Sequence, residues 1–130
     1  MNTGAPLRVL YAEDDRISAV LMAQILAIET GIDLRLAEDG AEALAALADD
    51  WLPDLLILDA HLPDTTGHAL LARLRAQPGL QRVPACMCSA DGLAEDRQRA
   101  AEAGFDDYWT KPVSVPAVLE CLRSLKAARR

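Results

Sequence analysis

Carboxylates close two of the apolar runs in this 130-residue chain, and side chains in that position can do chemistry. Asp59 ends the run Asp54-Leu-Leu-Ile-Leu-Asp59, and Glu13 and Asp14 follow the run Arg8-Val-Leu-Tyr-Ala12. Carboxylates gathered in one place repel one another unless a cation lies between them, and Mg²⁺ is a hard cation that binds oxygen ligands. The pattern therefore predicts a Mg²⁺ site. It also predicts a carboxylate nucleophile that could attack a phosphoryl group.

These runs must be strands of one parallel sheet if their ends are to meet. Five short apolar or β-branched runs alternate with helical patterns, and we expect strands over residues 7–12, 33–37, 54–59, 83–88 and 106–110. Such alternation is typical of an α/β fold in which helices cover both faces of a parallel sheet. The carboxyl ends of the strands then converge on one rim. This rim would bring together Glu13, Asp14, Asp59, Ser89 and Lys111.

Two of the predicted helices carry further expectations. The first has apolar residues at helical spacing, which predicts that they form one buried face: Ile17, Val20, Leu21, Ile25 and Ile28. The helix over residues 92–103 offers Leu93, several alanines and many charges, so its apolar stripe is thin. Such a helix is either an ordinary solvated helix or an element that shifts when the nearby rim changes charge.

Length and composition favour one soluble domain over residues 1–130, with a core over about 7–125 and short flexible tails. The net charge of −7 and the isoelectric point near 4.7 oppose direct nucleic-acid binding, which depends on basic side chains. The sequence lacks a signal-like start and an apolar run of about 18 residues, so we expect a cytoplasmic protein without membrane insertion. The thiols of Cys86, Cys88 and Cys121 should then be reduced.

Each candidate residue also has a purely structural interpretation. Glu13, Asp14 and Asp15 could cap the helix that follows them, and we expect Asp15 to do only that. Ser89 could be a helix N-cap, and Lys111 could be an exposed loop lysine. Asp59 is the hardest to dismiss, because a charge at the end of Leu-Leu-Ile-Leu would be unfavourable if it were buried without a partner. The coincidence of all these residues at strand ends favours a functional site.

The chain resembles the receiver domains of two-component response regulators from about residue 7 to residue 125. Four motifs carry the resemblance, in order and separated by whole strand and helix units: Val9-Leu-Tyr-Ala-Glu-Asp-Asp15, the run from Pro53 through Asp59 to Gly67, Ser89-Ala90, and the run from Gly104 to Lys111-Pro112. The resemblance implies a flavodoxin-like, doubly wound sheet of five parallel strands in the order 2-1-3-4-5.

The resemblance also implies a reaction and its residues. Asp59 would accept a phosphoryl group from a histidine kinase or a histidine phosphotransfer protein, while Lys111 would pair with a phosphoryl oxygen and Ser89 would hydrogen-bond to it. The domain would catalyse its own phosphorylation and slow autodephosphorylation, and it would not be a metabolic enzyme.

Metal binding, switching and phosphoryl loss are implied in the same way. Asp14 would bind Mg²⁺ directly, Glu13 through water, and Asp59 and the backbone carbonyl of His61 would complete the protein ligands. Tyr108 would change rotamer with Ser89, and the fourth helix, last strand and last helix would present the changed face to a downstream protein. Alternatively, Tyr108 is a static exposed residue. Two side chains would tune the rate of phosphoryl loss: His61 and Asp91.

Several alternatives stay open at this point. One is a Mg²⁺-dependent phosphatase with an Asp nucleophile, although His61 stands where such enzymes have a second carboxylate. Another is a pseudo-receiver that signals by binding alone, although such proteins usually lack one of Asp59, Asp14 or Lys111. We expect the unphosphorylated chain to be a monomer. The sequence leaves open whether it is a stand-alone receiver or the receiver of a hybrid histidine kinase.

Overall fold

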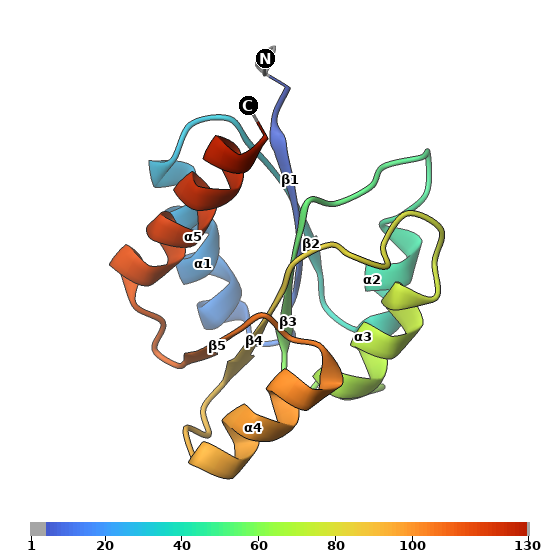
Figure 1. Cartoon of the computed structure of the whole chain (residues 1–130), viewed down its shortest axis with the longest axis vertical. Helices are drawn as coiled ribbons and strands as arrows, with labels where there is room; N and C mark the ends of the chain where they lie inside the picture. The colour runs from blue at the N-terminus through green and yellow to red at the C-terminus, as the bar shows by residue number, and fades with distance from the viewer. Residues whose placement is uncertain (1–4, 130) are drawn as a thin grey trace.

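The computed structural model describes residues 5–129, in which strands and helices alternate along the chain (Figure 1). In chain order the elements are β1 Leu7–Ala12, α1 Arg16–Ile28, β2 Ile32–Ala37, α2 Gly40–Ala45, β3 Leu55–Asp59, α3 Gly67–Arg75, β4 Ala85–Ser89, α4 Ala94–Ala103, β5 Asp107–Thr110 and α5 Val115–Ala128. The strands expected from the sequence are confirmed within one or two residues at each end.

The five strands form one parallel sheet in the order β2-β1-β3-β4-β5, which confirms the expected fold class. Their carboxyl ends are in register. Ala12 of β1 lies beside Leu58 of β3, Asp59 lies beside Cys88 of β4, and Ser89 lies beside Thr110 of β5. The chain therefore leaves β1, β3, β4 and β5 along one rim of the sheet, where the candidate residues were expected.

Alternate strand residues point to opposite faces, so the sheet has two buried clusters. On one face, Leu10, Leu56 and Met87 pack with residues of α2, α3 and α4. On the other face, Tyr11 and Trp109 pack with residues of α1 and α5. Figure 1 shows α1 and α5 on one side of the strands and α2 and α3 on the other. Trp109 is buried in this second cluster.

The predicted buried face of α1 is confirmed for Ile25 and is wrong for the other four residues. The residues of α1 that are buried are Met22, Ile25 and Leu26, whereas Ile17 is 71% exposed and Leu21 is 51% exposed. Val20 and Ile28 are exposed as well. This helix has apolar residues around most of its circumference, so periodicity alone could not select the stripe that meets the sheet. Its outer surface is therefore apolar, which is unusual for a solvent-facing helix.

Helix α4 is anchored as thinly as its sequence indicates. Ala100 is its buried residue, and Leu93, which stands at the N-cap and not inside the helix, is 62% exposed. Leu93 also makes no side-chain capping bond. The helix ends at Gly104, whose φ of 106° lies in the left-handed region that favours glycine.

The ends of the chain lie partly outside the described residues. Residues 1–4 and 130, where the sequence analysis expects flexible tails, lie outside the described residues, and α5 continues as far as Ala128, beyond the expected end of the core. Among the described residues, no helix combines the length and the apolar character that crossing a membrane requires.

Candidate functional site

The end of β1 delivers two carboxylates that face different surroundings. The N–H of Glu13 donates to the carbonyl of Ala37 at 2.9 Å, so this residue continues beside β2 and its side chain is buried. Its two carboxylate oxygens accept from the hydroxyl of Tyr11 at 3.2 Å and from the N–H of Asp15 at 3.1 Å. Asp14 is exposed. The same turn thus holds one carboxylate inside and offers the next to solvent.

Asp15 caps α1, as expected. Its side chain accepts from the N–H of Ser18 at 2.9 Å and from the Ser18 hydroxyl at 2.8 Å. These bonds hold the pKa of Asp15 below its usual range. Because Asp15 satisfies the first turn of the helix, Glu13 and Asp14 are not needed as caps.

Lys111 lies between the two buried carboxylates. Its Nζ atom is 2.5 Å from a carboxylate oxygen of Asp59 and 2.5 Å from a carboxylate oxygen of Glu13. The lysine follows β5, and its N–H donates to the carbonyl of Ser89 at 2.8 Å, which fixes the loop that carries it. Its peptide bond to Pro112 is cis. Lys111 is therefore a positioned ion-pair partner and not an exposed loop lysine.

The three ionisable groups around this lysine have shifted pKa values. Burial raises the pKa of Glu13, and this effect outweighs the hydrogen bond from Lys111 that lowers it. Burial alone would lower the pKa of Lys111, but its hydrogen bonds to Asp59 and Glu13 raise it overall. Burial and the neighbouring Glu13 charge raise the pKa of Tyr11, so its hydroxyl stays protonated and donates. The site therefore holds a protonated lysine over an excess of carboxylates.

The carboxylates also fit a divalent cation. One oxygen from each of Glu13, Asp14 and Asp59 can be chosen so that all three lie within 4.8 Å of one another. An all-oxygen set that includes one exposed member suits Mg²⁺, which keeps several waters when it binds to proteins. Asp59 is 7% exposed, so its charge is largely removed from water. Beside it, the N–H of His61 donates to Asp59 Oδ2 at 3.2 Å.

The approach to Asp59 from α3 is tight. A Cβ atom on Gly67, the first residue of α3, would lie 2.6 Å from the Asp59 carbonyl oxygen and 3.0 Å from the sulfur of Met87. Glycine is therefore required here by close packing. The motif around residue 67 was visible in the sequence, but the reason for its glycine was not.

Ser89 and Tyr108 meet at the loop after β4. The buried hydroxyl of Ser89 accepts from the N–H of Asp91 at 3.0 Å, and the hydroxyl of Tyr108 donates to the carbonyl of Asp91. Ser89 is not the N-cap of α4, since that position is Leu93. Tyr108 is half-buried and hydrogen-bonded, so it is not an exposed strand residue, while its change of rotamer stays a prediction.

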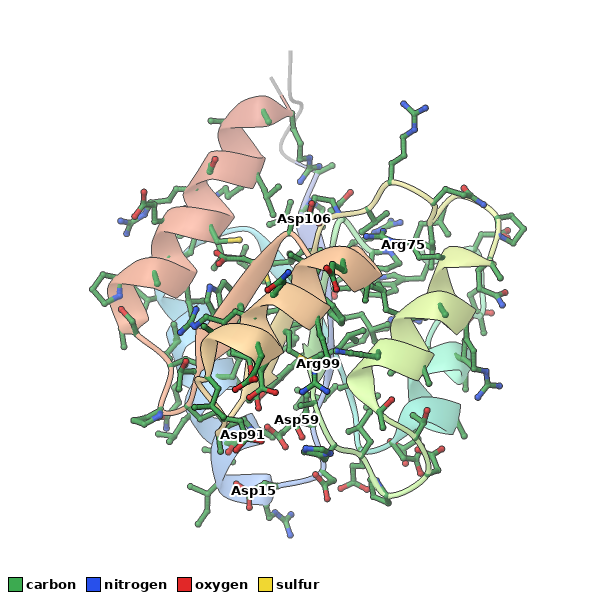
Figure 2. All side chains as sticks on the ribbon, turned by 60° about the horizontal axis from the view of Figure 1, so that its bottom comes forward. Asp15, Asp59, Arg75, Asp91, Arg99 and Asp106 are labelled. Atoms are coloured by element: carbon green, nitrogen blue, oxygen red, sulfur yellow. The ribbon has the colours of Figure 1, made fainter. Side chains whose placement is uncertain are left out.

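Ser89, Asp91 and Tyr108 line a cavity of about 240 Å³ that also reaches Ala60 and His61, the two residues after Asp59. Its lining comes from the loop after β3, from α3, from β4 and its loop, and from α4 and β5: Ala60, His61, Thr66, His68, Met87, Ser89, Asp91, Asp96, Arg99 and Tyr108. His61 and Asp91 thus lie on one cavity next to Asp59. Figure 2, turned to show this rim, has Asp59, Asp91 and Arg99 on it.

The sequence analysis missed two residues that contribute contacts to the candidate site. Tyr11 donates to Glu13 from inside the core. Arg97 of α4 lies over the ring of Tyr108, with its guanidinium carbon 5.0 Å from the ring centroid, and it donates to the hydroxyl of Thr110 at 2.8 Å. An arginine among many charges on a helix gives no sequence signal for such a contact. Tyr11 was missed because the sequence pattern identified it only as a residue of a strand.

The fold and the site define an α/β domain of flavodoxin-like topology with an acidic cluster and a lysine at the carboxyl rim of its sheet. The sequence profile of the response regulator receiver domain matches residues 9–123. The chain therefore belongs to the receiver-domain family of two-component response regulators.

Relatives agree with this assignment. The probable transcriptional regulatory protein TcrX of Mycobacterium tuberculosis is 39% identical over 123 residues, which cover 94% of this chain and 50% of that protein. The chain spans about half the length of the first such relatives, which are named transcriptional regulatory proteins.

Solved structures show the same fold. A putative response regulator from Chloroflexus aurantiacus superposes with a TM-score of 0.83 and 31% identity, covering 94% of this chain and 98% of that one. The receiver domain of a sensor histidine kinase from Pseudomonas aeruginosa superposes with a TM-score of 0.80 and 26% identity, covering 93% and 98%. Its structure contains a magnesium ion coordinated in the active-site cleft.

Proposed function

We propose that this chain is a phosphorylation-dependent switch in which Asp59 accepts a phosphoryl group from a phosphohistidine donor. The observation that carries the proposal is the position of Lys111 Nζ, 2.5 Å from Asp59 and bonded also to Glu13, above a set of carboxylates that fits a cation. Phosphoryl transfer depends mainly on positioning and charge compensation, and this rim offers both.

Each residue has a defined part in the proposed reaction. The Asp59 carboxylate attacks the phosphorus, while the donor imidazole leaves. Lys111 pairs with one phosphoryl oxygen, and the buried Ser89 hydroxyl donates to another. Glu13, Asp14 and Asp59, with the backbone carbonyl of His61, would hold Mg²⁺. The bound cation supplies charge compensation for the incoming phosphoryl oxygens.

Loss of the phosphoryl group would take place on the same rim. The exposed side chains of His61 and Asp91 line the cavity beside the acceptor, where a hydrolytic water would approach. An imidazole and a carboxylate there can orient or repel that water, so the two residues set the phosphoryl lifetime.

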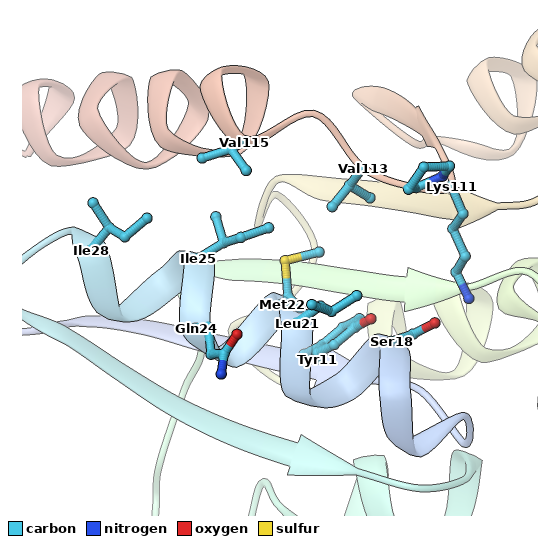
Figure 3. A pocket seen from close by; sticks show the side chains of 11 residues that line it. Tyr11, Ser18, Leu21, Met22, Gln24, Ile25, Ile28, Lys111, Val113 and Val115 are labelled. Atoms are coloured by element: carbon cyan, nitrogen blue, oxygen red, sulfur yellow. The ribbon is translucent and has the colours of Figure 1, made fainter.

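The exposed surface of α1 supports the identity of the donor as a protein. Ile17, Leu21 and Ile28 face solvent, and a mostly apolar cavity of about 590 Å³ lies between α1 and the start of α5 (Figure 3). Lys111 closes one end of this cavity. An apolar surface that adjoins the acceptor site suits a docked partner, because contiguous exposed apolar surface is uncommon on monomeric proteins. A histidine kinase or histidine phosphotransfer protein would dock there.

The response of the domain would run through the loop after β4. A phosphoryl group adds about −1.5 to −2 charges and three acceptor oxygens. It would draw the Ser89 hydroxyl away from the N–H of Asp91 and loosen the bond between Asp91 and Tyr108. Helix α4, with its single buried alanine, follows this loop. The face formed by α4, β5 and α5 would then bind a downstream protein differently. The monomeric state of the unphosphorylated chain and its lack of direct nucleic-acid contact remain predictions.

The test is phosphoryl transfer from a histidine donor. A histidine phosphotransfer protein, labelled on its phosphohistidine and freed of ATP, is mixed with this chain in the presence of Mg²⁺. We expect the label to move to the wild type and not to Asp59→Asn, and a chelator should abolish the transfer. A panel of several donors is needed, because cognate pairs react fastest. Failure with every donor, together with failure of acetyl phosphate, would overturn the proposal.

A further inference from the structure

Two cysteines from distant parts of the chain meet on the face of the sheet that α5 covers. Cys86 is on β4 and is 2% exposed, while Cys121 is on α5 and is half-buried. Both side chains belong to the packing between the sheet and α5, and their thiols lie close enough for each to shift the pKa of the other. The third cysteine, Cys88, points to the same side of the sheet two residues later, but it is 0% exposed. The three thiols therefore differ sharply in their surroundings.

The pair is reachable from solvent. An open cavity of about 410 Å³ has both Cys86 and Cys121 in its lining, together with Asp106, Asp107 and Glu120. Cys88 does not line it. A small oxidant could therefore enter through this opening and reach the more exposed Cys121 first.

The two thiols share their protons unequally. The hydrogen bond donated by Cys86 lowers the pKa of Cys121, although burial and the nearby Asp107 and Asp106 charges oppose this. The same hydrogen bond, followed by burial, raises the pKa of Cys86. Burial raises the pKa of Cys88 to about 12. Thiolate character is what makes a cysteine nucleophilic, so Cys121 is the reactive member of the pair.

We propose that Cys86 and Cys121 are a redox-sensitive dithiol that a peroxide converts into an intramolecular disulfide between β4 and α5. The Cys121 thiolate attacks one peroxide oxygen, which breaks the O–O bond and gives a sulfenic acid and a hydroxide that takes a proton. The Cys86 sulfur, losing its proton, then attacks the Cys121 sulfur and expels water. Two thiols lose two electrons, and one hydrogen peroxide is reduced to two waters.

The disulfide would tie the last helix to β4, the neighbour of the central strand β3. Cys86 lies beside Ile57, two residues before Asp59 in β3, so the new bond would stand behind the acceptor rim and not on it. Helix α5 would lose freedom to move relative to β4, and the oxidised chain should unfold at a higher temperature than the reduced chain.

The experiment counts thiols and maps the bond. The wild type is treated with hydrogen peroxide, freed of it by catalase, unfolded and alkylated with N-ethylmaleimide. Reduced protein should take up three alkyl groups, one on each cysteine, and oxidised protein should take up one, on Cys88. Digestion without reductant should yield one peptide pair joined through Cys86 and Cys121.

Two variants sharpen the result. Cys88→Ser is the matched control, and its oxidised form should take up no alkyl group because the pair still forms. Cys121→Ser should keep both remaining thiols at the same peroxide dose. Three results would overturn the proposal: three free thiols after oxidation, a Cys121 sulfinic acid beside a free Cys86, or a dimer linked through Cys121. None of these readouts involves phosphorylation, so the proposed function is tested separately.

Discussion

Lys111 and Glu13, 98 residues apart in the chain, form an ion pair at the rim of the sheet, and the same ammonium group binds Asp59. One lysine therefore links the ends of β1, β3 and β5 before any phosphoryl group is present. Because Glu13 and Asp59 are both buried, this contact compensates charges that would otherwise be unfavourable in the core. A phosphoryl group on Asp59 would compete with Glu13 for the ammonium group of Lys111.

Removing the Lys111 ammonium group should destabilise the folded domain when no Mg²⁺ is bound. For Lys111→Met we expect the free energy of unfolding in urea at neutral pH to fall by about 2–3 kcal/mol, since two buried carboxylates lose their partner. Lys126→Met is the matched control. Lys126 pairs with the partly exposed Glu29, which Arg123 also binds, so its loss leaves Glu29 paired and should change stability by less than about 1 kcal/mol. Equal effects of the two substitutions would contradict this account.

The effect of Lys111→Met should depend on pH with a definite sign. The pKa of Glu13 is raised in the folded protein, so the folded state binds more protons than the unfolded chain as the pH falls toward that value. The variant lacks the hydrogen bond from Lys111 that lowers this pKa. As the pH is lowered from neutral to about 5, its free energy of unfolding should therefore rise relative to that of the wild type. Urea unfolding of the wild type and the variant at neutral pH and at about pH 5 measures this difference. A deficit that stays constant or grows on acidification would contradict the prediction.

Metal binding should separate two neighbouring aspartates. Asp14→Asn should lower the affinity for Mg²⁺ at least about 10-fold in titration calorimetry, because a direct carboxylate ligand is lost. Asp15→Asn should bind Mg²⁺ nearly as well as wild type, since Asp15 caps α1 and asparagine caps equally well. A larger loss for Asp15→Asn than for Asp14→Asn would show that the ligands were assigned incorrectly.

The apolar surface of α1 should matter for protein donors alone. We expect the double variant Ile17→Ser, Leu21→Ser to slow phosphoryl transfer from a phosphohistidine protein about 10-fold or more through weaker docking. Its phosphorylation by acetyl phosphate should be unchanged, because neither residue touches Asp59. Leu52→Ser is the control, since Leu52 is also exposed but lies between α2 and β3. If phosphorylation by acetyl phosphate is slowed as much as transfer from the protein, the substitutions act on the Asp59 site and not on docking, which would contradict the prediction.

The contact between Arg97 and Tyr108 should hold α4 to β5. Arg97→Ala should speed amide hydrogen exchange in α4 and β5 by about 3- to 10-fold, equivalent to about 0.5–1.5 kcal/mol. Arg99→Ala should not affect β5, because Arg99 pairs with Asp96 on its own helix.

Phosphorylation of the wild type should change amide hydrogen exchange in α4, and Ser89→Ala should lack this change. Identical exchange in Arg97→Ala and Arg99→Ala would remove the basis for this coupling.

Local patterns sufficed for the strands and for the residues at their ends. The run Leu-Leu-Ile-Leu before Asp59 favoured a buried strand, and parallel topology then placed Asp59 beside Glu13 and Lys111. The face of α1 could not be read, because Ile17 and Met22 are equally apolar and only the packed sheet selects between them.

Contacts between distant side chains were equally hidden. The Arg97–Tyr108 stack and the Cys86–Cys121 pair depend on how α4 and α5 pack against their strands. No spacing in the sequence encodes such packing. The role of Asp15, in contrast, is a local capping bond to Ser18, and it was predicted correctly.

The most direct test of the central claim is the intact mass of the protein after incubation with acetyl phosphate. With Mg²⁺ the wild type should gain one phosphoryl group, about 80 mass units, and this gain should be absent with a chelator and absent in Asp59→Asn. A gain that persists in Asp59→Asn would place the acceptor elsewhere. No gain in the wild type with Mg²⁺ would contradict the account and leave a receiver fold that signals by binding alone.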